Sequence, residues 1–173
     1  ADEVAHWARE VRADGHARRE GYALSAANLA EAVLYNGLGR YADALEAGRR
    51  ELPHTAELYH AMRALLEVVE AATRTGDAAT AQEALQRLRD VTEPVGDNDW
   101  AQAMLALAEA QLADGDAAEV RYLRAIELFG RVPVPMLVAP SQLLYGELLR
   151  RDQRRIDARA QLRPAYEVLS ACG

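Results

Sequence analysis

The sequence contains no lysine and a single cysteine, and each of these features excludes certain kinds of site. All 20 of its Lys and Arg residues are arginine. A phosphate-binding loop of the GxxxxGK type requires lysine, so this nucleotide site is excluded. Because Cys172 has no second cysteine to pair with, an internal disulfide and a cysteine-based zinc site are excluded as well. We attribute the missing lysines to GC-rich codon usage rather than to a need for the bidentate contacts of arginine.

Other features that the sequence lacks indicate where the protein is located and which activities it does not have. No apolar run is long enough to cross a bilayer, and the chain has no signal-peptide pattern, so we expect a cytoplasmic protein without a membrane partner. The formal net charge of −7 argues against direct binding of nucleic acid by this chain. The patterns GxGxxG and GxSxG are also missing, and we therefore predict no catalytic residues, no enzymatic activity and no cofactor in this chain.

Some carboxylate and histidine spacings resemble metal ligands but offer too few of them. Asp114, Asp116 and Glu119 are too few oxygen ligands for calcium, and Asp116 is expected to cap a helix instead. Two His–Glu pairs with one-turn spacing supply only two ligands each, and we expect surface pairs there. The sequence therefore predicts no metal site.

A turn residue recurs at nearly even steps along the chain. Gly39, Gly76, Gly115 and Gln153 occupy the turns, at steps of 37, 39 and 38 residues. Small residues recur seven positions before each turn residue and five positions after it. These are Ala32, Val69, Ala108 and Gly146 before the turns, and Ala44, Ala81, Val120 and Ala158 after them. Antiparallel helices approach closely only where side chains are small, so the pattern predicts four helical hairpins.

The hairpins predict an all-α fold, a superhelix or solenoid of about nine helices in a single domain, 1–173. An apolar fraction of 50%, rich in Ala and Leu, is typical of helices. The expected hairpins cover 17–53, 55–92, 98–131 and 136–171, and an orphan helix covers 2–13. We expect the partner of this orphan helix to lie upstream, which would leave Trp7 exposed. The pitch, with Tyr35 and Tyr41 beside the first turn, resembles tetratricopeptide repeats, although the steps exceed the usual 34 residues of that repeat.

Capping residues and prolines set several expected helix ends. Asp77 is placed to cap the helix that follows it, and Asn98 or Asp99 to cap the next one. The segment 92–99 is the longest linker, and we expect a loop there. Pro164 would cost about 3 kcal/mol inside a straight helix, so we expect a kink at this position or a later helix start.

The groove of such a superhelix is the first candidate binding surface. Residues one position after the small crossing residues face the concave side, and three of them are Glu70, Glu109 and Glu147. An acidic ladder of this kind suits a basic or polar partner, whereas a solvated face without a partner is the alternative. The candidate groove residues are Asn36, Arg63, Glu70, Arg74, Gln102, Glu109, Glu147 and Arg150.

A cluster of arginines near the end of the sequence is the second candidate. It comprises Arg150, Arg151, Arg154, Arg155, Arg159 and Arg163, offset by Asp152 and Asp157. One interpretation is an arginine-rich solvated turn. The other is a docking patch, centred on Arg151, Arg154, Arg155 and Arg159, for an acidic partner or for DNA held by an adjoining domain.

Three stretches of the sequence carry a family resemblance. They are AEAVLYNGLGRYADAL, NDWAQAMLALAEAQLADGDAAEVRYLRAIELFGRV and LLYGELLRRDQRRIDARAQLRPAYEVL. They resemble the helical repeat region of the large ATP-binding LuxR-family transcriptional regulators of actinobacteria, over most of residues 23 to 171. The resemblance implies a sensor domain between an upstream ATPase module, which would bind ATP, and a downstream helix-turn-helix. The chain begins at Ala1 without methionine, and we expect a piece of a longer protein.

These observations lead to one main functional hypothesis and two alternatives. We expect a regulatory interaction domain that relays binding of a protein, peptide or small effector to the adjoining ATPase and DNA-binding domains. The first alternative is a free-standing peptide-binding scaffold. The second is a small-molecule receptor with a pocket around Trp100, Tyr59 and Tyr35. Self-association through the Trp7 end would make the chain a homo-oligomer.

Overall fold

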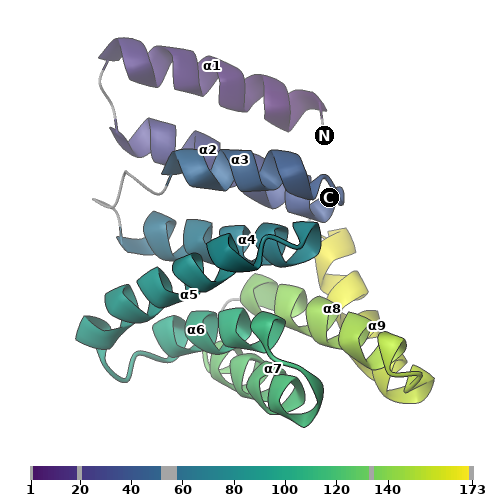
Figure 1. Ribbon diagram of the computed structural model, residues 1–173. Coiled ribbons are helices and arrows are strands. Elements are labelled where there is room, and N and C mark those ends of the chain that lie inside the picture. The colour runs from purple at the N-terminus through teal and green to yellow at the C-terminus, as the bar shows by residue number, and fades with distance from the viewer. Residues whose placement is uncertain (1, 19–20, 52–57, 133–134, 172–173) are drawn as a thin grey trace. The chain divides into compact units, whose positions relative to one another are not determined.

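The computed structural model describes residues 2–18, 21–51, 58–132 and 135–171 (Figure 1). These residues form nine α-helices and, within the described ranges, no strand, so the predicted all-α class is confirmed. The helices are α1 (Asp2–Arg18), α2 (Gly21–Gly37), α3 (Tyr41–Glu51), α4 (Leu58–Thr75), α5 (Ala78–Thr92), α6 (Asp99–Leu112), α7 (Gly115–Gly130), α8 (Pro135–Arg151) and α9 (Arg155–Ala171).

The helices pack in two compact units, Ala1–Pro94 and Val95–Gly173. The first unit contains α1 to α5 and the second contains α6 to α9. The division falls in the linker that the sequence predicts as a loop, and part of this linker is a 3₁₀ helix, Glu93–Val95. Pro94 removes a backbone donor and Gly96 has a φ of 65°, so α5 cannot continue through it. The single continuous stack that the repeat pattern predicts stays a prediction.

Three of the four predicted turns share one backbone geometry. Gly39, Gly76 and Gln153 have φ values of 71°, 77° and 62°, and Gln153 is the only non-glycine residue with positive φ among those described. Each turn closes with a bond between residues five apart, from Arg40 N to Tyr35 O at 2.8 Å, from Asp77 N to Ala72 O at 2.9 Å and from Arg154 N to Leu149 O at 2.9 Å. This is the Schellman motif, in which a left-handed residue ends the helix.

The third turn differs from the other three. Gly115 has a φ of 54°, but it is the first residue of α7, and Ala113 is extended where the other turns are left-handed. As a result Ala118 is fully buried, whereas Val120, predicted to lie at the helix crossing, is 65% exposed. Two residues correspond to about 200° of rotation on a helix, which turns Val120 outward. The predicted crossing position at Val120 is therefore wrong by two residues.

Close helix approach is confirmed in the last hairpin. A Cβ atom added to Gly146 on α8 would lie 2.6 Å from Leu162 Cγ and 3.3 Å from the backbone oxygen of Ala158, both on α9. Such distances leave no room for a side chain. Small residues therefore permit the contact between α8 and α9, as the recurrence of small residues predicts.

The first helix is longer than the sequence predicts. It runs through the expected break at Asp14 and Gly15 to Arg18, and it packs on α2, so its partner is within the chain. Gly15 is buried against α2, where an added Cβ would lie 3.1 Å from Leu24 Cδ2. Trp7 is 47% exposed, as expected. A glycine next to an aspartate therefore marks a close contact here rather than a helix end.

Two predicted caps are confirmed and one is wrong. Asp77 Oδ1 accepts from Thr80 N at 3.1 Å, and Asn98 Oδ1 accepts from Ala101 N at 3.0 Å, so Asn98 rather than Asp99 caps α6. Asp116 lies in the first turn of α7, one residue after its start, and does not occupy the cap position. The last helix begins at Arg155 and continues through Pro164, without the later start that this proline suggested.

Candidate functional site

An open groove lies between α6 and α7 in the second unit. Its volume is about 220 Å³. The residues that line it are Gln102, Leu105, Ala106 and Glu109 from α6, and Val120, Arg121, Arg124 and Leu128 from α7. Four of the lining side chains are aliphatic, and the other four, which we call its polar rim, are Gln102, Glu109, Arg121 and Arg124. We call this the α6–α7 groove.

The register of α7 creates the apolar wall of this groove. Ala118 packs against α6 in place of Val120, and Val120 is left exposed beside Leu105. The alanines of α6 allow the two helices to pack closely along their buried faces, because Ala103 and Ala108 are fully buried. The close packing of Ala118 thus leaves the large aliphatic side chain of Val120, two residues later, at the surface.

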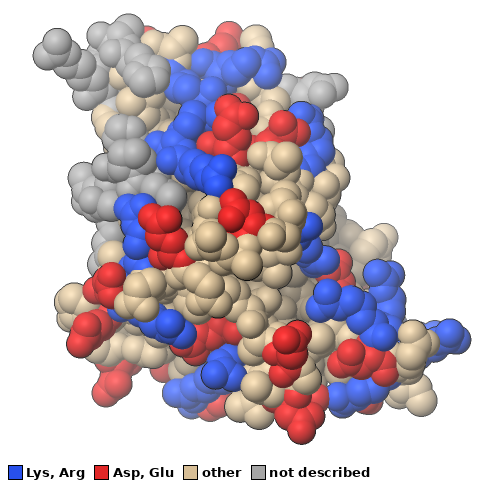
Figure 2. All heavy atoms as spheres, in the orientation of Figure 1, with Lys and Arg blue, Asp and Glu red and all other residues tan. Residues whose placement is uncertain are grey.

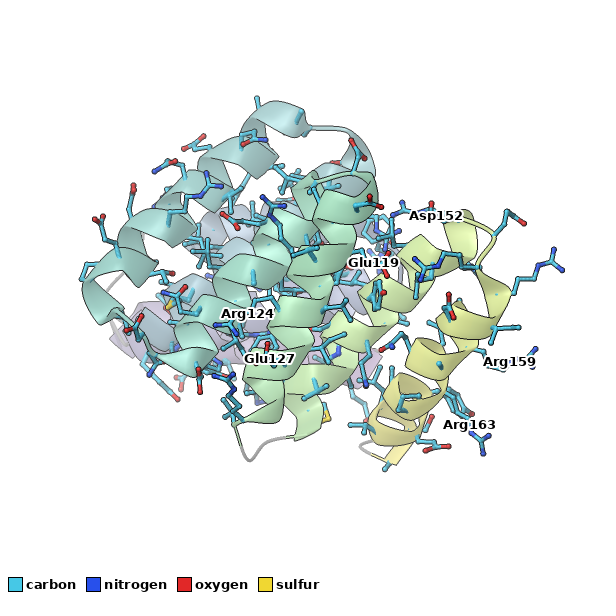
Figure 3. The ribbon with its side chains drawn as sticks, turned by 90° about the horizontal axis from the view of Figure 1, so that it is seen from below. Glu119, Arg124, Glu127, Asp152, Arg159 and Arg163 are labelled. Atoms are coloured by element: carbon cyan, nitrogen blue, oxygen red, sulfur yellow. The ribbon has the colours of Figure 1, made fainter. Side chains whose placement is uncertain are left out.

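Charges of both signs surround the apolar interior. Arg121 Nε lies 3.5 Å from Glu109 Oε2, an ion pair that links α7 to α6. Arg124 Nη1 donates to Glu127 at 3.1 Å, and Arg131 also binds Glu127. These hydrogen bonds, that of Arg124 first, hold the pKa of the Glu127 carboxyl below its usual value. Figure 3 shows Arg124 and Glu127 together on α7. The rim therefore offers both guanidinium and carboxylate groups at neutral pH.

Two of the eight predicted groove residues line the α6–α7 groove. These are Gln102, whose Nε2 also donates to Gly96 O at 2.9 Å, and Glu109. The prediction that they face a concave surface formed by several hairpins stays a prediction. The structure places them at a groove formed within one hairpin.

Two other predicted groove residues, Asn36 and Arg63, bind Glu67 in the first unit. Asn36 is 6% exposed, and its Nδ2 donates to both Glu67 O at 3.0 Å and Glu67 Oε2 at 2.9 Å. Arg63 Nη2 donates to the other carboxylate oxygen of Glu67 at 2.8 Å. Asn36 thus joins α2 to α4, which corrects its assignment to an open groove.

The remaining predicted groove residues are divided between the units. Glu70 and Arg74 are on α4, and the Arg74 guanidinium lies 5.5 Å from the ring centroid of Tyr41. Glu147 and Arg150 are on α8, where Glu147 is half-buried and Arg150 is exposed. Because Glu70 belongs to the first unit, its alignment with the acids of the second unit stays a prediction.

A hydrogen-bonded network holds α7, α8 and α9 together. Tyr145 Oη donates to Glu119 Oε1 at 2.6 Å, and Arg154 Nη1 donates to the other oxygen of the same carboxylate. Arg154 Nε also donates to Asp157 at 2.9 Å. Tyr122 stacks on Tyr145 with ring centroids 5.7 Å apart. One residue of the predicted docking patch, Arg154, is therefore paired with carboxylates of this chain.

The same network shifts the pKa of each of its central groups. Burial, followed by the bond to Glu119, raises the pKa of Tyr145 to about 12. The hydrogen bonds from Arg154 and Tyr145 lower the pKa of Glu119. The bond to Glu119 raises the pKa of Arg154 further above its already high value. At neutral pH, Glu119 is therefore an ionised carboxylate that accepts hydrogen bonds from a neutral tyrosine and a charged arginine.

The other residues of the predicted docking patch are exposed. Arg151, Arg155 and Arg159 lie at the end of α8 and along α9, and Figure 2 shows basic side chains gathering where these helices end and begin. In Figure 3, Arg159 points away from the other helices of the second unit. Arg154 thus differs from its neighbours in the sequence, because it is paired with a carboxylate of another helix.

A second cavity, in the first unit, surrounds a buried carboxylate. Its volume is also about 220 Å³, and its lining residues are Arg9, Arg12, Glu31, Tyr35, Asp43, Glu46 and Arg50. Arg12 and Arg50 both bind Glu31 Oε2, the latter at 2.6 Å. Tyr35 lines this cavity, and Tyr59 is exposed on α4, while Trp100 belongs to the second unit. The small-molecule pocket predicted around these three aromatic residues stays a prediction.

Sequence reasoning missed most of the α6–α7 groove. It assigned Val120 to a helix crossing and did not single out Arg121, Arg124 or Leu105. The adjacent pair Ala117 and Ala118 was the available signal, because either alanine fits a helix crossing better than valine does.

Comparisons with known proteins give no family assignment. A scan against family models finds none that matches the chain, and a search of curated proteins finds no match. Within the described ranges, no three His, Cys, Asp or Glu side chains are grouped so that they could hold a metal ion. No helix in those ranges combines the length and the hydrophobicity needed to cross a membrane.

Proposed function

We propose that this chain is a helical-repeat interaction domain that binds a peptide segment of a partner protein in the α6–α7 groove. One observation carries the proposal: Val120 is 65% exposed and forms the wall of a cavity of about 220 Å³. Exposed apolar surface with a polar rim is typical of protein interaction sites. An aliphatic side chain of a partner would cover Val120 and Leu105 and remove both from water.

The polar rim indicates what kind of peptide fits. Arg121 and Arg124 would bind carboxylates of the partner, and Gln102 and Glu109 would accept hydrogen bonds from its donors. A groove between two antiparallel helices suits an amphipathic helix, whose apolar residues recur on one face. We therefore propose an amphipathic helical peptide with an aliphatic anchor and an acidic residue beside it.

The regulatory role is a separate part of the proposal, and it rests on the sequence resemblance. The stretches quoted above resemble the sensor region of LuxR-family regulators, and an all-α array of hairpins agrees with such a region. In this role the bound peptide would change how the domain contacts an ATPase and a DNA-binding module. The coding sequence on either side tests it, because an upstream ATPase and a downstream helix-turn-helix are expected. A reading frame with neither would overturn the regulator assignment and leave the groove proposal intact.

A random-peptide display library tests the groove. Peptides selected on the wild-type domain are measured against Val120→Arg, which places a charge in the apolar wall. The control is Leu123→Arg, which makes the same chemical change at another exposed position of α7 outside the groove. We expect Val120→Arg to weaken binding by about tenfold or more and Leu123→Arg to leave it unchanged. If both variants bind every selected peptide as the wild type does, the groove is not the binding site.

A further inference from the structure

The two faces of α9 differ sharply in their surroundings. Ala158 and Ala165 are buried against the rest of the second unit, in which α9 packs on α8. On the other side of the helix, Ile156 is 86% exposed and Tyr166 is 72% exposed. The solvent-facing side of a helix is usually polar, because water covers it. The exposure of two large apolar side chains on this face is therefore unusual and indicates a surface that a partner covers.

Arginines lie among these apolar residues. Arg155, Arg159 and Arg163 recur every four residues, which places them along one side of α9. The guanidinium groups of Arg155 and Arg159 make no hydrogen bond or ion pair with any side chain that the structure describes. Arg163 Nε donates only to Glu167, at 3.1 Å, in a pair that is largely exposed. Figure 3 shows Arg159 and Arg163 directed away from the helix bundle.

The local charge is opposite to that of the whole chain. Six arginines and two aspartates lie between Arg150 and Arg163, whereas the chain carries a net charge of −7. Exposed cations without intramolecular partners attract an anionic ligand over a Debye length. Arginine in particular binds carboxylates through two parallel hydrogen bonds.

We propose that the outer face of α9 docks an acidic amphipathic helix of a partner protein. This surface, defined by Arg155, Ile156, Arg159, Arg163 and Tyr166, is separate from the α6–α7 groove and does not depend on it. Ile156, Arg159, Arg163 and Tyr166 follow one another at spacings of three, four and three residues, so they form a stripe about 15 Å long. A partner helix along this stripe would place aliphatic residues on Ile156 and Tyr166 and carboxylates beside the arginines.

The composition of the stripe favours protein over nucleic acid. Arginine and tyrosine are enriched in the residues that dominate protein interfaces. A DNA backbone would gain nothing from the apolar side chain of Ile156. An acidic helix meets the arginines with the same charge complementarity and also covers the apolar side chains.

The fold holds this surface rigid before a partner arrives. Arg154, at the start of α9, binds Glu119 of α7, and Tyr145 of α8 binds the same carboxylate. The turn before α9 is closed by the bond from Arg154 N to Leu149 O, with Gln153 in the left-handed region. A preformed surface loses less conformational entropy on binding.

The test uses random-peptide selection on the intact chain, followed by fluorescence anisotropy of the enriched peptides at low and high salt. The first variant is Arg155→Glu/Arg159→Glu. The matched control is Arg87→Glu/Arg89→Glu, which makes the same charge change on α5, outside both proposed surfaces. Circular dichroism checks that both variants keep the helical content of the wild type. We expect a class of peptides rich in Asp, Glu and aliphatic residues, whose affinity falls about tenfold or more in the α9 variant and stays unchanged in the control.

Three results would overturn this proposal. The first is that no acidic class is enriched. The second is that both variants weaken the acidic peptides equally, which would show an effect of total charge alone. The third is that a fluorescein-labelled DNA duplex, and not the acidic peptides, binds in a manner that depends on Arg155 and Arg159. A class that Val120→Arg weakens and the α9 variant does not weaken belongs to the α6–α7 groove, so the two proposals succeed or fail separately.

Discussion

The two units use their charged side chains differently. In the first unit, two carboxylates are buried between helices, Glu31 and Glu67, and these are the buried carboxylates of the described residues. The same unit also carries exposed pairs such as Arg40 with Asp43. In the second unit the ion pairs are at the surface, around the α6–α7 groove and at the start of α9. Helices in both units pack through alanines, so the difference concerns only the polar residues.

Buried carboxylates join helices, whereas only some surface charges do so: Arg154 joins α9 to α7, and Arg159 joins no helices among the described residues. Glu31 binds arginines from α1 and α3, and Glu67 binds Asn36 of α2, so each carboxylate fixes the position of neighbouring helices. A buried charge of this kind is costly unless its partners are present. Surface arginines such as Arg159 carry no such constraint and contribute little to folding. These arginines are available to bind a partner, so the second unit is where we expect a binding surface.

The largest expected effect comes from removing a buried carboxylate. Glu31→Ala leaves Arg12 and Arg50 without their shared partner, and we expect it to lower the free energy of unfolding by about 3 kcal/mol. Urea denaturation measures this change. The control is Glu46→Ala, which also removes a partner of Arg50 but from an exposed position, and its expected cost is about 0.5 kcal/mol. Equal effects of the two variants would contradict the structural role of charge in the first unit.

A packing variant is expected to have a smaller effect in the second unit. Gly146→Ala places a methyl group 2.6 Å from Leu162 Cγ, and the resulting overpacking is expected to destabilise by about 2 kcal/mol. Gly130→Ala is the matched control, because a Cβ there has nothing within 4 Å. Alanine is the better helix former, so the control is expected to be neutral or slightly stabilising. Destabilisation by both variants, or by neither, would show that the contact between α8 and α9 does not limit stability.

The sequence predicts the hairpins well because their turns depend on local chemistry. The spacing of the turn residues identifies Gln153 as equivalent to Gly39 and Gly76, and the structure gives all three positive φ. The third turn shows the limit of this approach. Glycine at 115 is left-handed there too, but it begins a helix instead of ending one, and Val120 is consequently exposed. A recurring residue type does not fix the register of the helix that follows it.

Candidate site residues are harder to predict because they depend on contacts between helices. Asn36 follows Ala32 by one helical turn, so it shares the buried face of α2, and this spacing was a usable signal. Which arginines pair within the fold has no comparable signal. Arg154 and Arg155 are adjacent in the sequence, yet only Arg154 reaches Glu119, 35 residues away. Such pairings follow from how the helices pack, which the repeat pattern does not specify.

The hydroxyl of Tyr145 provides a test with a pH dependence. Tyr145→Phe removes one of two donors to Glu119, and we expect a loss of about 1 kcal/mol at neutral pH. The folded-state pKa of about 12 lies above the ordinary tyrosine value of 10.0, so the folded protein holds this proton more tightly than the unfolded chain. The stabilisation is therefore complete below about pH 10 and disappears as the pH rises toward 12.

Urea denaturation of both proteins across this range checks the prediction about Tyr145. The stability difference between wild type and Tyr145→Phe should shrink as the pH rises. Tyr166→Phe is the control, because that side chain is exposed on α9, and it should follow the wild type throughout. A difference that stays constant as the pH rises would show that the folded protein does not hold the Tyr145 proton more tightly than the unfolded chain.

The smallest expected effect on stability is that of removing an exposed arginine of α9. Arg159→Ala removes an exposed guanidinium without a described partner, and we expect the free energy of unfolding to change by no more than about 0.5 kcal/mol. Arg154→Ala, five residues earlier, breaks the bonds to Glu119 and Asp157 and should lower the midpoint of urea denaturation more. If instead Arg159→Ala is the more destabilising of the two, α9 uses its outer arginines to fold. The second unit would then use its arginines to hold helices together, as the first unit does, and these arginines would not be free to bind a partner.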